Sequence, residues 1–294
     1  MTSPYIRRLR LATELRTLRE QAGVTAGDLA QRIYRSRTLI SKLENAHCNP
    51  NLGDVSNILN ALDVTGEKVD EIFTIARDAA ARGWWDSYGD AMGARQRMYA
   101  NIESGAATIR GYNQFTLPGL LQSPEFTQAL IAIDKHEGTK IDYVPERSLE
   151  ARRRRQEAVF QPDGPYFETV LDEFVLRRLA VPTETLANQL HHMVGVLTRE
   201  PRFTVLVLPT DARLSPGRLP VSGYMIYTFP DPGDPAIAVA ESVSSCTIHA
   251  QPEEVAQYER LHDRLREAAL PALDSLSLLA DTADRLSEQV GHGK

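Results

Sequence analysis

A short run of hydrogen-bonding side chains near the N-terminus has the chemistry needed to read base pairs. The run consists of Arg37, Thr38, Ser41 and Lys42. In the major groove of DNA, arginine can donate two hydrogen bonds to a single guanine, and threonine or serine can bond to several bases. A helix whose exposed face is short, polar and basic fits this groove. We therefore predict that these four residues contact base edges.

Four neighbouring residues are predicted to contact the phosphate backbone instead. Thr25 and Ala26 lie where a helix is expected to begin, and the free amide groups at a helix N-terminus attract anions. Arg35 and Asn45 flank the base-reading run. From there they could reach the phosphates that orient a protein on the duplex.

Five short helices are expected to hold these residues in place. Apolar residues recur at helical spacing, and Thr25, Ser36 and Asn51 stand where a side-chain cap is needed. Gly23 follows the first helix, where a left-handed residue is favoured. The helices are predicted over 9–21, from 25, from 36, from 51 and over about 67–81. Together they would form a compact bundle.

Charge is distributed unevenly along the chain. The 294 residues carry a net charge of −6, which alone would argue against nucleic-acid binding. Residues 1–46 contain nine basic and four acidic side chains, a net charge of +5, so the remainder carries −11. This asymmetry predicts a basic module that touches phosphates, attached to an acidic body that does not.

The rest of the chain has a mixed pattern of helices and strands. Trp84, Trp85 and a glycine-containing stretch to Gly93 indicate a junction, so we predict domains over 1–82 and 83–294. Helical patterns cover about 94–107, 123–134, 145–159, 183–199, 253–269 and 273–289, and the strands, expected only later, cover 166–171, 203–208, 224–229 and 236–240. The predicted fold is an all-α helix-turn-helix bundle followed by an α+β domain with a small sheet.

Two N-terminal motifs resemble the helix-turn-helix of the Xre and phage-repressor family. They are AGVTAGDLA at 22–30 and SRTLISKLE at 36–44, and the resemblance covers about the first 65 residues. It implies a DNA-binding module in which Arg19 pairs with Glu44 as part of the scaffold. The alternative is a helical bundle that serves protein contacts.

The sequence departs from this family at two positions. Ala26 stands where the family usually has a glutamine, and alanine cannot make that contact. Ala46 stands where a glycine usually follows the glutamate. Asn45 could adopt the left-handed conformation in its place.

The larger domain resembles the C-terminal domain of the Scr-type antitoxin-like regulators, a domain long labelled as of unknown function. The matching landmarks, weak singly but ordered over nearly 200 residues, are Trp85, Tyr99, Glu103, Ala106, Ile109, Tyr112, the run LPGLLQ at 117–122, Arg152, Gln156, Leu171 to Glu173, Gln189, Leu190, Val207 to Pro209, Glu241, Val255 and Tyr258. The resemblance implies a small protein partner encoded nearby.

Several polar residues of the second domain could line a ligand or partner pocket. They are Glu103, Tyr112, Gln122, Glu173 and Glu241. Each could equally cap a helix or face solvent, so a pocket role and a structural role are both open interpretations. The run at 117–122 is predicted to be a buried turn that leads into a helix, because proline fixes one backbone angle and three leucines favour burial.

The four arginines at 152–155 invite a basic-stripe interpretation. Successive helical residues are rotated by about 100°, so four in a row spread around the helix and cannot form one stripe. We expect some of them to pair with carboxylates, with additional phosphate contact as the alternative. His191 and His192 are adjacent, which is the wrong spacing for joint metal chelation on a helix.

Other function classes find little support. The chain has no recognisable nucleotide loop, nucleophile elbow or zinc-protease motif, so we expect no enzyme activity, no cofactor and no metal. Asp172 and Glu173 follow a predicted strand, where acidic residues more often begin a helix than perform acid and base chemistry. Cys48 and Cys246 lack nearby partners, which excludes a disulfide framework. No apolar run could span a bilayer and the N-terminus lacks a signal peptide, so we expect a cytoplasmic protein.

Taken together, the residues predict a sequence-specific DNA-binding transcriptional regulator. One short recognition helix reads few base pairs, so we expect a homodimer on an inverted repeat, with much of the dimer surface supplied by the second domain. A protein partner or a small-molecule effector would act through that domain. The alternative is an antitoxin-like protein whose main role is to bind a small partner protein, with DNA binding serving its own promoter. An enzyme directed to DNA is a third, unsupported class.

Overall fold

The computed structural model describes residues 2–136, 143–178, 180–242 and 245–292. The chain forms two compact units that are each built from three segments. The first contains the chain up to Ser87, Met98–Ala106 and Phe229–Pro235, and the second contains Tyr88–Arg97, Ala107–Thr228 and the chain from Ala236. The sequence places a domain boundary after residue 82, and the first unit continues five residues further.

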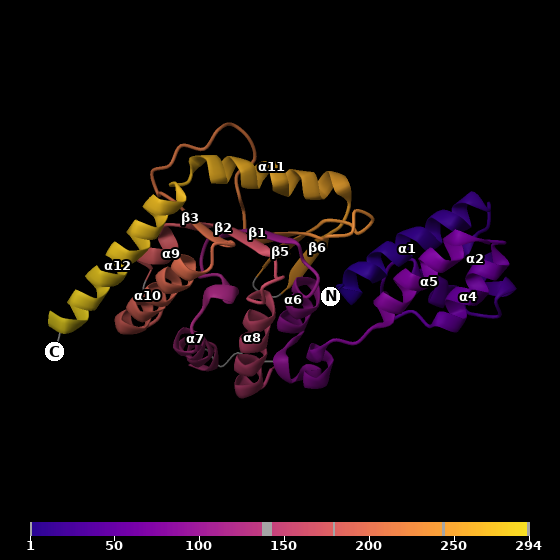
Figure 1. Cartoon of the computed structure of the whole chain (residues 1–294), viewed down its shortest axis with the longest axis horizontal. Helices are drawn as coiled ribbons and strands as arrows, with labels where there is room; N and C mark the ends of the chain where they lie inside the picture. Colours follow the sequence, from indigo (N-terminus) through magenta and orange to yellow (C-terminus); the bar gives the residue numbers. More distant parts are fainter. Residues whose placement is uncertain (1, 137–142, 179, 243–244, 293–294) are drawn as a thin grey trace. The chain divides into compact units, whose positions relative to one another are not determined.

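Five helices make up the N-terminal part of the first unit, as the sequence predicts (Figure 1). They are α1 (Pro4–Gln21), α2 (Ala26–Arg32), α3 (Arg37–Leu43), α4 (Leu52–Ala61) and α5 (Glu67–Ala80). The predicted caps are confirmed, because Thr25, Ser36 and Asn51 each accept a hydrogen bond from a backbone amide two or three residues later. Leucine, isoleucine, valine and alanine side chains from all five helices form one buried core.

Helix α1 begins five residues earlier than the apolar pattern predicts. Its N-cap is Ser3, whose Oγ accepts a hydrogen bond from the amide of Ile6, and Pro4 occupies the first helical position. Proline suits that position because its missing amide hydrogen would have no intrahelical partner there. Ser3 followed by Pro4 is therefore the start signal of this helix, and the arginines that come next interrupt the apolar periodicity.

A six-stranded mixed sheet forms the centre of the second unit. The strands are β1 (Thr108–Asn113), β2 (Tyr166–Asp172), β3 (Phe203–Leu208), β4 (Tyr224–Thr228), β5 (Ile237–Glu241) and β6 (Cys246–His249). Their order is β3-β2-β1-β4-β5-β6, in which β1, β2 and β3 are parallel and β4, β5 and β6 are added antiparallel. This confirms a helical N-terminal domain followed by an α+β domain.

Two of the six strands, β1 and β6, were not predicted. The expectation of a helix over 94–107 is wrong at its end, because α6 (Ala94–Glu103) stops before β1 begins. The expectation that strands come only later in the chain is also wrong, because β1 precedes the first predicted strand by more than 50 residues. Gly111 lies within β1, where a Cβ atom would stand 2.3 Å from the sulfur of Met225 on β4. A glycine inside a strand weakens the sequence signal but allows this close approach.

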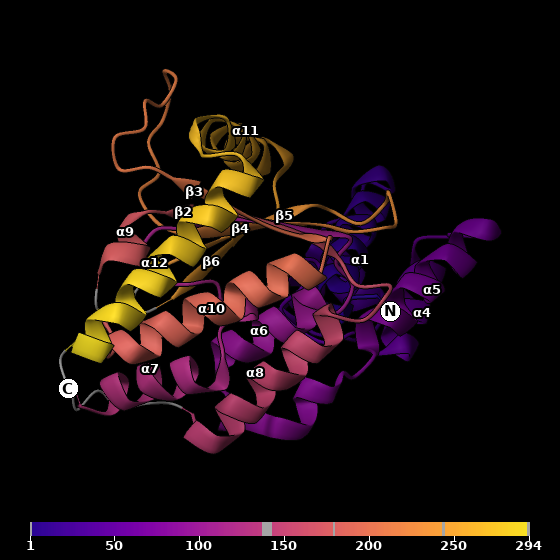
Figure 2. The ribbon, with the colours of Figure 1, turned by 60° about the vertical axis from the view of Figure 1, so that its left-hand side comes forward.

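Helices cover both faces of the sheet (Figures 1 and 2). Helix α11 (Pro252–Ala268) lies on one side, and α7 (Pro124–His136), α8 (Pro145–Val159) and α10 (Thr183–Arg199) lie on the other. Helix α12 (Ala272–His292) packs against α10 and β3. The remaining elements are short, namely η1 (Trp84–Met92), η2 (Gly119–Leu121) and α9 (Phe174–Arg177). Within the described residues, no helix is both long enough and apolar enough to cross a bilayer.

The four arginines of α8 point in different directions, as the helical rotation predicts. Their contacts are Arg152 with Gln122, Arg153 with Glu157, Arg154 over the ring of Tyr88 and Arg155 with Gln96. Arg155 is 7% exposed and therefore belongs to the interior of the second unit. No basic stripe is formed by these described side chains, and Arg153 pairs with a carboxylate.

Ala46, rather than Asn45, adopts the left-handed conformation after α3. Ala46 has a φ of 57°, and Asn45 is not among the described residues with positive φ. The suggestion that asparagine would replace the usual glycine is therefore wrong. The side chain of Asn45 instead bonds to the carbonyl oxygen of Ser41 at 2.6 Å, which keeps Asn45 close to the helix. An alanine in this conformation costs about 1 kcal/mol or more relative to glycine.

Ala46→Gly is therefore expected to stabilise the first unit. The relief of strain exceeds the extra entropy of glycine in the unfolded chain, so we expect a gain of about 0.5–1 kcal/mol. Both tryptophans of the chain, Trp84 and Trp85, lie in this unit, so urea unfolding followed by tryptophan fluorescence measures the change. Ala22→Gly is the control, because Ala22 has a φ of −75° and glycine relieves no strain there. Equal effects of the two substitutions would contradict the explanation.

Candidate nucleic-acid interface

The four predicted base-reading residues share the exposed face of α3. Arg37, Thr38, Ser41 and Lys42 are all exposed, whereas Ile40 and Leu43 are buried in the core. Among the described residues, the side chains of Arg37 and Lys42 take part in no hydrogen bond or ion pair. Their donors are therefore available to an external acceptor, as direct reading of bases requires.

A buried ion pair fixes the end of this helix. The Nε and Nη2 atoms of Arg19 donate to the two carboxylate oxygens of Glu44 at 2.6 and 2.9 Å, and Nη1 donates to the carbonyl oxygen of Val24. The hydrogen bonds to Glu44 raise the pKa of Arg19 against the opposing effect of burial. The side chains are 13% and 7% exposed. The pair implied by the family resemblance is thus confirmed, and it joins α1 to the residue that ends α3.

Arg35 is held by a second carboxylate. Its Nε atom donates to Oδ1 of Asp54 at 2.7 Å, and Asp54 lies in the first turn of α4 with its side chain 11% exposed. The Arg35 side chain is itself half exposed, and its two terminal nitrogens make no hydrogen bond within the described part of the chain. The pair orients the guanidinium without using its outer donors. A phosphate contact by Arg35 stays a prediction with this geometry in its favour.

Thr25 and Asn45, also predicted to contact phosphates, already form hydrogen bonds within the chain. Thr25 accepts from the amide of Asp28 and donates to its carboxylate, which lies in the first turn of α2 beside Ala26. A carboxylate there competes with any phosphate for the helix amides. Asn45 donates to Ser41 and accepts from Nη2 of Arg16 at 2.9 Å. Contacts from these residues to DNA remain predictions.

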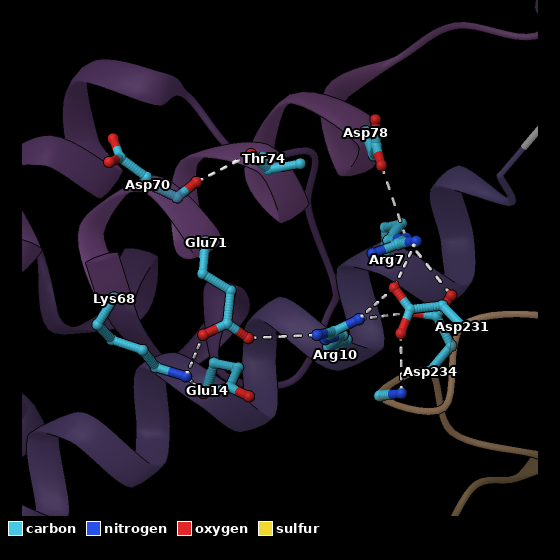
Figure 3. A network of polar contacts seen from close by, with 11 residues as sticks. Arg7, Arg10, Glu14, Lys68, Asp70, Glu71, Thr74, Asp78, Asp231 and Asp234 are labelled. Atoms are coloured by element: carbon cyan, nitrogen blue, oxygen red, sulfur yellow. Dashed lines mark hydrogen bonds and ion pairs between the residues drawn. The ribbon is translucent and has the colours of Figure 1, made fainter.

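Much of the basic charge of α1 is used inside the first unit (Figure 3). Arg7 and Arg10 both donate to Asp231, at 3.0 and 2.9 Å, in the 229–235 loop that connects β4 to β5. They also pair with Asp78 and Glu71 of α5, respectively. The net charge of +5 in residues 1–46 therefore overstates the charge available to phosphates. No local sequence signal pointed to this network, because Asp231 lies more than 220 positions from Arg7 and Arg10.

The predicted pocket residues lie at separate places. Gln122 lines a cavity of about 270 Å³ with Arg152 and Gln156, and Glu173 lines another of about 280 Å³ with Arg177. Glu103 is buried in the first unit, Tyr112 is buried in the second, and Glu241 ends β5. A pocket role for each stays a prediction, and the structure does not bring Gln122 and Glu173 to one cavity.

The paired carboxylates Asp172 and Glu173 have structural contacts. Asp172 accepts from the hydroxyl of Tyr112 at 2.9 Å and from the amide of Phe174, where α9 begins. Burial, together with the adjacent carboxylate, raises the pKa of Tyr112. Glu173 accepts from Arg177 and from the amide of Thr210. The prediction that these acids begin a helix is confirmed.

Two family comparisons give results for this chain. Residues 96–281 match the domain of unknown function DUF5753, and residues 10–72 match a helix-turn-helix domain. The first match covers most of the second unit together with the two shorter segments of the first. The chain has no significant match among curated proteins or among solved structures.

Removing Arg19 is expected to destabilise the first unit strongly. Arg19→Met leaves the buried carboxylate of Glu44 without its main partner, so we expect a loss of about 3–5 kcal/mol. Tryptophan fluorescence in urea measures this loss, and the double variant Arg19→Met/Glu44→Leu should recover most of it. Lys68→Met is the control, because it breaks partly exposed pairs of the same unit, each worth under about 1 kcal/mol. A loss for Arg19→Met no larger than the control would refute a scaffold role.

Proposed function

Because the chain belongs to the family defined by the domain of unknown function DUF5753 and carries a helix-turn-helix domain before it, we propose that it is a sequence-specific transcriptional regulator of the Xre type. The observation that carries this proposal is the exposed face of α3, where Arg37 and Lys42 have uncommitted donors on a helix fixed by a buried ion pair. That combination of free donors and a rigid support suits base recognition.

The proposal includes a homodimer on an inverted repeat. Helix α3 has seven residues and can contact only a few base pairs, so a second copy would supply the remaining specificity. Much of the dimer surface would come from the DUF5753 domain. A protein partner of the Scr type or a small ligand would act through the same domain, and the cavity lined by Gln122, Arg152 and Gln156 supports the ligand option.

The test is selection of binding sites by the full-length protein. A random duplex pool is passed over the protein at low salt, and the recovered sequences are aligned and footprinted. We expect an inverted repeat that binds two copies of the chain. Recovery of no enriched sequence would refute sequence-specific binding, and an enriched single half-site bound by one copy would refute the dimer alone.

A second candidate function is that of an antitoxin-like protein whose main partner is a small protein. The observation in its favour is the exposure of Leu219 (62%) and Val221 (92%) in the segment between β3 and β4. Large exposed apolar side chains often mark protein contacts. Stoichiometric capture of a small protein encoded beside this chain's gene, lost in Leu219→Ser/Val221→Ser, would favour this function.

We also propose that the chain has no catalytic role. The paired acids that could perform proton transfer, Asp172 and Glu173, are occupied by a helix cap, a tyrosine hydroxyl, a loop amide and an arginine. Turnover of a metabolite by the purified protein, abolished in Glu173→Gln, would contradict this proposal.

Arg37→Ala is expected to reduce the binding free energy for the selected duplex by about 1–3 kcal/mol per half-site and to relax the sequence preference at one base pair. The physical reason is loss of a guanidinium that can bond to one guanine edge. Binding titrations on the selected duplex and on single-base variants of it measure both effects. Equal losses on selected and scrambled duplexes would show that Arg37 contacts the backbone instead.

Arg35→Ala is expected to weaken binding to all duplexes alike. A phosphate contact carries no sequence information, and its loss should reduce the dependence of log Kd on log salt by about one charge per chain. Titrations of selected and scrambled duplexes at several salt concentrations measure this slope. Arg213→Ala is the control, because Arg213 is an exposed cation of the second unit. An unchanged slope would remove Arg35 from the phosphate contacts.

A further inference from the structure

The loop 229–235 belongs to the same compact unit as the helix-turn-helix domain. It connects β4 to β5, yet it is grouped with the chain up to Ser87. Its sequence, FPDPGDP, contains three prolines, which restrict its backbone. The Oδ1 atom of Asp231 accepts from the amide of Gly233, and the amide of Asp234 donates to the carbonyl oxygen of Asp231. The loop is therefore a stiff turn that presents two carboxylates.

Both carboxylates are directed at α1 (Figure 3). Asp231 accepts hydrogen bonds from Arg7 and Arg10 through one oxygen, and Asp234 lies 3.4 Å from Nε of Arg7. Gly233 lies against the same helix, because a Cβ atom there would stand 2.4 Å from Cζ of Arg10. Any other residue at 233 would require the guanidinium of Arg10 to move from its position beside Asp231.

The network is partly shielded from water, because Asp231 is 37% exposed whereas the other side chains of the loop contact are largely buried. The side chains of Arg7, Arg10 and Asp234 are 8%, 13% and 5% exposed. The pKa of Asp231 is lowered mainly by the hydrogen bond from the amide of Gly233. Arg10 lowers it further, so the Asp231 carboxylate stays charged. Ion pairs in such surroundings are less screened than pairs on the surface. The contact is therefore stronger than a loose surface attraction.

Helix α1 connects this network to the recognition helix. Arg10 and Arg19 lie on the same continuous helix, about 13 Å apart at 1.5 Å per residue. The first is held by Asp231 of the loop and by Glu71 of α5, and the second holds Glu44 at the end of α3. A helix does not stretch over this length. A change in how α1 sits on α5 is therefore passed to α3.

We infer that Asp231 and Asp234 are positioning residues for DNA binding, which set α1 against α5 and, through the Arg19 and Glu44 pair, set the recognition helix. This inference rests on the proposed function. It has a regulatory consequence, because the loop is covalently continuous with two strands of the DUF5753 domain. A ligand or partner that shifts β4 relative to β5 changes the DNA affinity through this loop.

The competing explanation is that the loop only stabilises the first unit. Loss of a purely stabilising contact lowers the free energy of unfolding but leaves the folded recognition helix unchanged. The two explanations therefore differ in the ratio of affinities for selected and scrambled DNA, and in whether α3 loses more protection from hydrogen exchange than α4 does, because a loss of stability alone lowers protection in both helices.

The test uses the full-length variant Asp231→Asn/Asp234→Asn. Kd is measured for a duplex selected by the wild-type protein and for a scrambled duplex of equal length, and amide exchange is followed in α1, α3 and α4. We expect about a tenfold weaker affinity for the selected duplex, an unchanged affinity for the scrambled one, and a larger increase of exchange in α1 and α3 than in α4. Asp163→Asn/Asp211→Asn is the matched control, because it removes the same charge from exposed positions of the second unit and should change neither readout.

An increase of exchange in α3 no larger than that in α4, or equal changes in Kd for the two duplexes, would overturn the inference. Should the double variant fail to fold, Asp231→Asn alone is used, since Asp231 is 37% exposed and its loss is better tolerated. Should the wild-type protein not discriminate between duplexes, the proposed function fails, and amide exchange in α3 relative to α4 still decides whether the loop positions that helix.

Discussion

The pairing of arginines on α1 with carboxylates from other segments is the interaction on which the first unit depends. Arg7 and Arg10 lie in the first two turns of α1, and the first turn contains no acidic residue. Positive charge near a helix N-terminus is unfavourable because the helix dipole is positive there. Asp78, Asp231 and Asp234 supply the missing negative charge from α5 and from the 229–235 loop. Packing and charge together therefore fix this helix.

The same pairing determines which cations remain for DNA. Arg7, Arg10 and Arg19 are committed to internal carboxylates, whereas Arg37 and Lys42 on α3 are exposed. These basic residues thus form a structural group on α1 and a proposed recognition group on α3. A count of charges along the sequence cannot separate these groups, because it contains no information on which carboxylates fold back onto the module.

Local patterns predicted much of the fold, and long-range contacts account for most of what was missed. Thr183–Arg199 and Phe203–Leu208 follow their predicted bounds because each has a clear period and a boundary residue at each end. The strand Thr108–Asn113 was not predicted because it carries Arg110 and Gly111, whose contacts with neighbouring elements exist only in the folded chain. Arg110, for example, pairs with Glu259 of α11.

The candidate site shows the same division. The exposed polar face of α3 and its cap could be predicted because both lie within nine consecutive residues, and the Arg19 and Glu44 pair could be predicted from a family resemblance. Base contacts by this face stay a prediction. The roles of Asp54 and of the 229–235 loop were not accessible, since each depends on a carboxylate that meets its arginine only in the folded chain.

The allocation of charge also bears on how the proposed regulator would distinguish its site from other DNA. Affinity for any duplex grows with the number of cations that displace counterions from phosphates. This chain directs few free cations outward from α3, and residues 47–294 carry −11. Non-specific attraction is therefore weak, and base contacts must supply a large share of the binding energy. Small displacements of α3 then change the affinity for the correct site more than the affinity for random DNA. Under that condition, a loop that holds α1 in place can act as a control on DNA recognition.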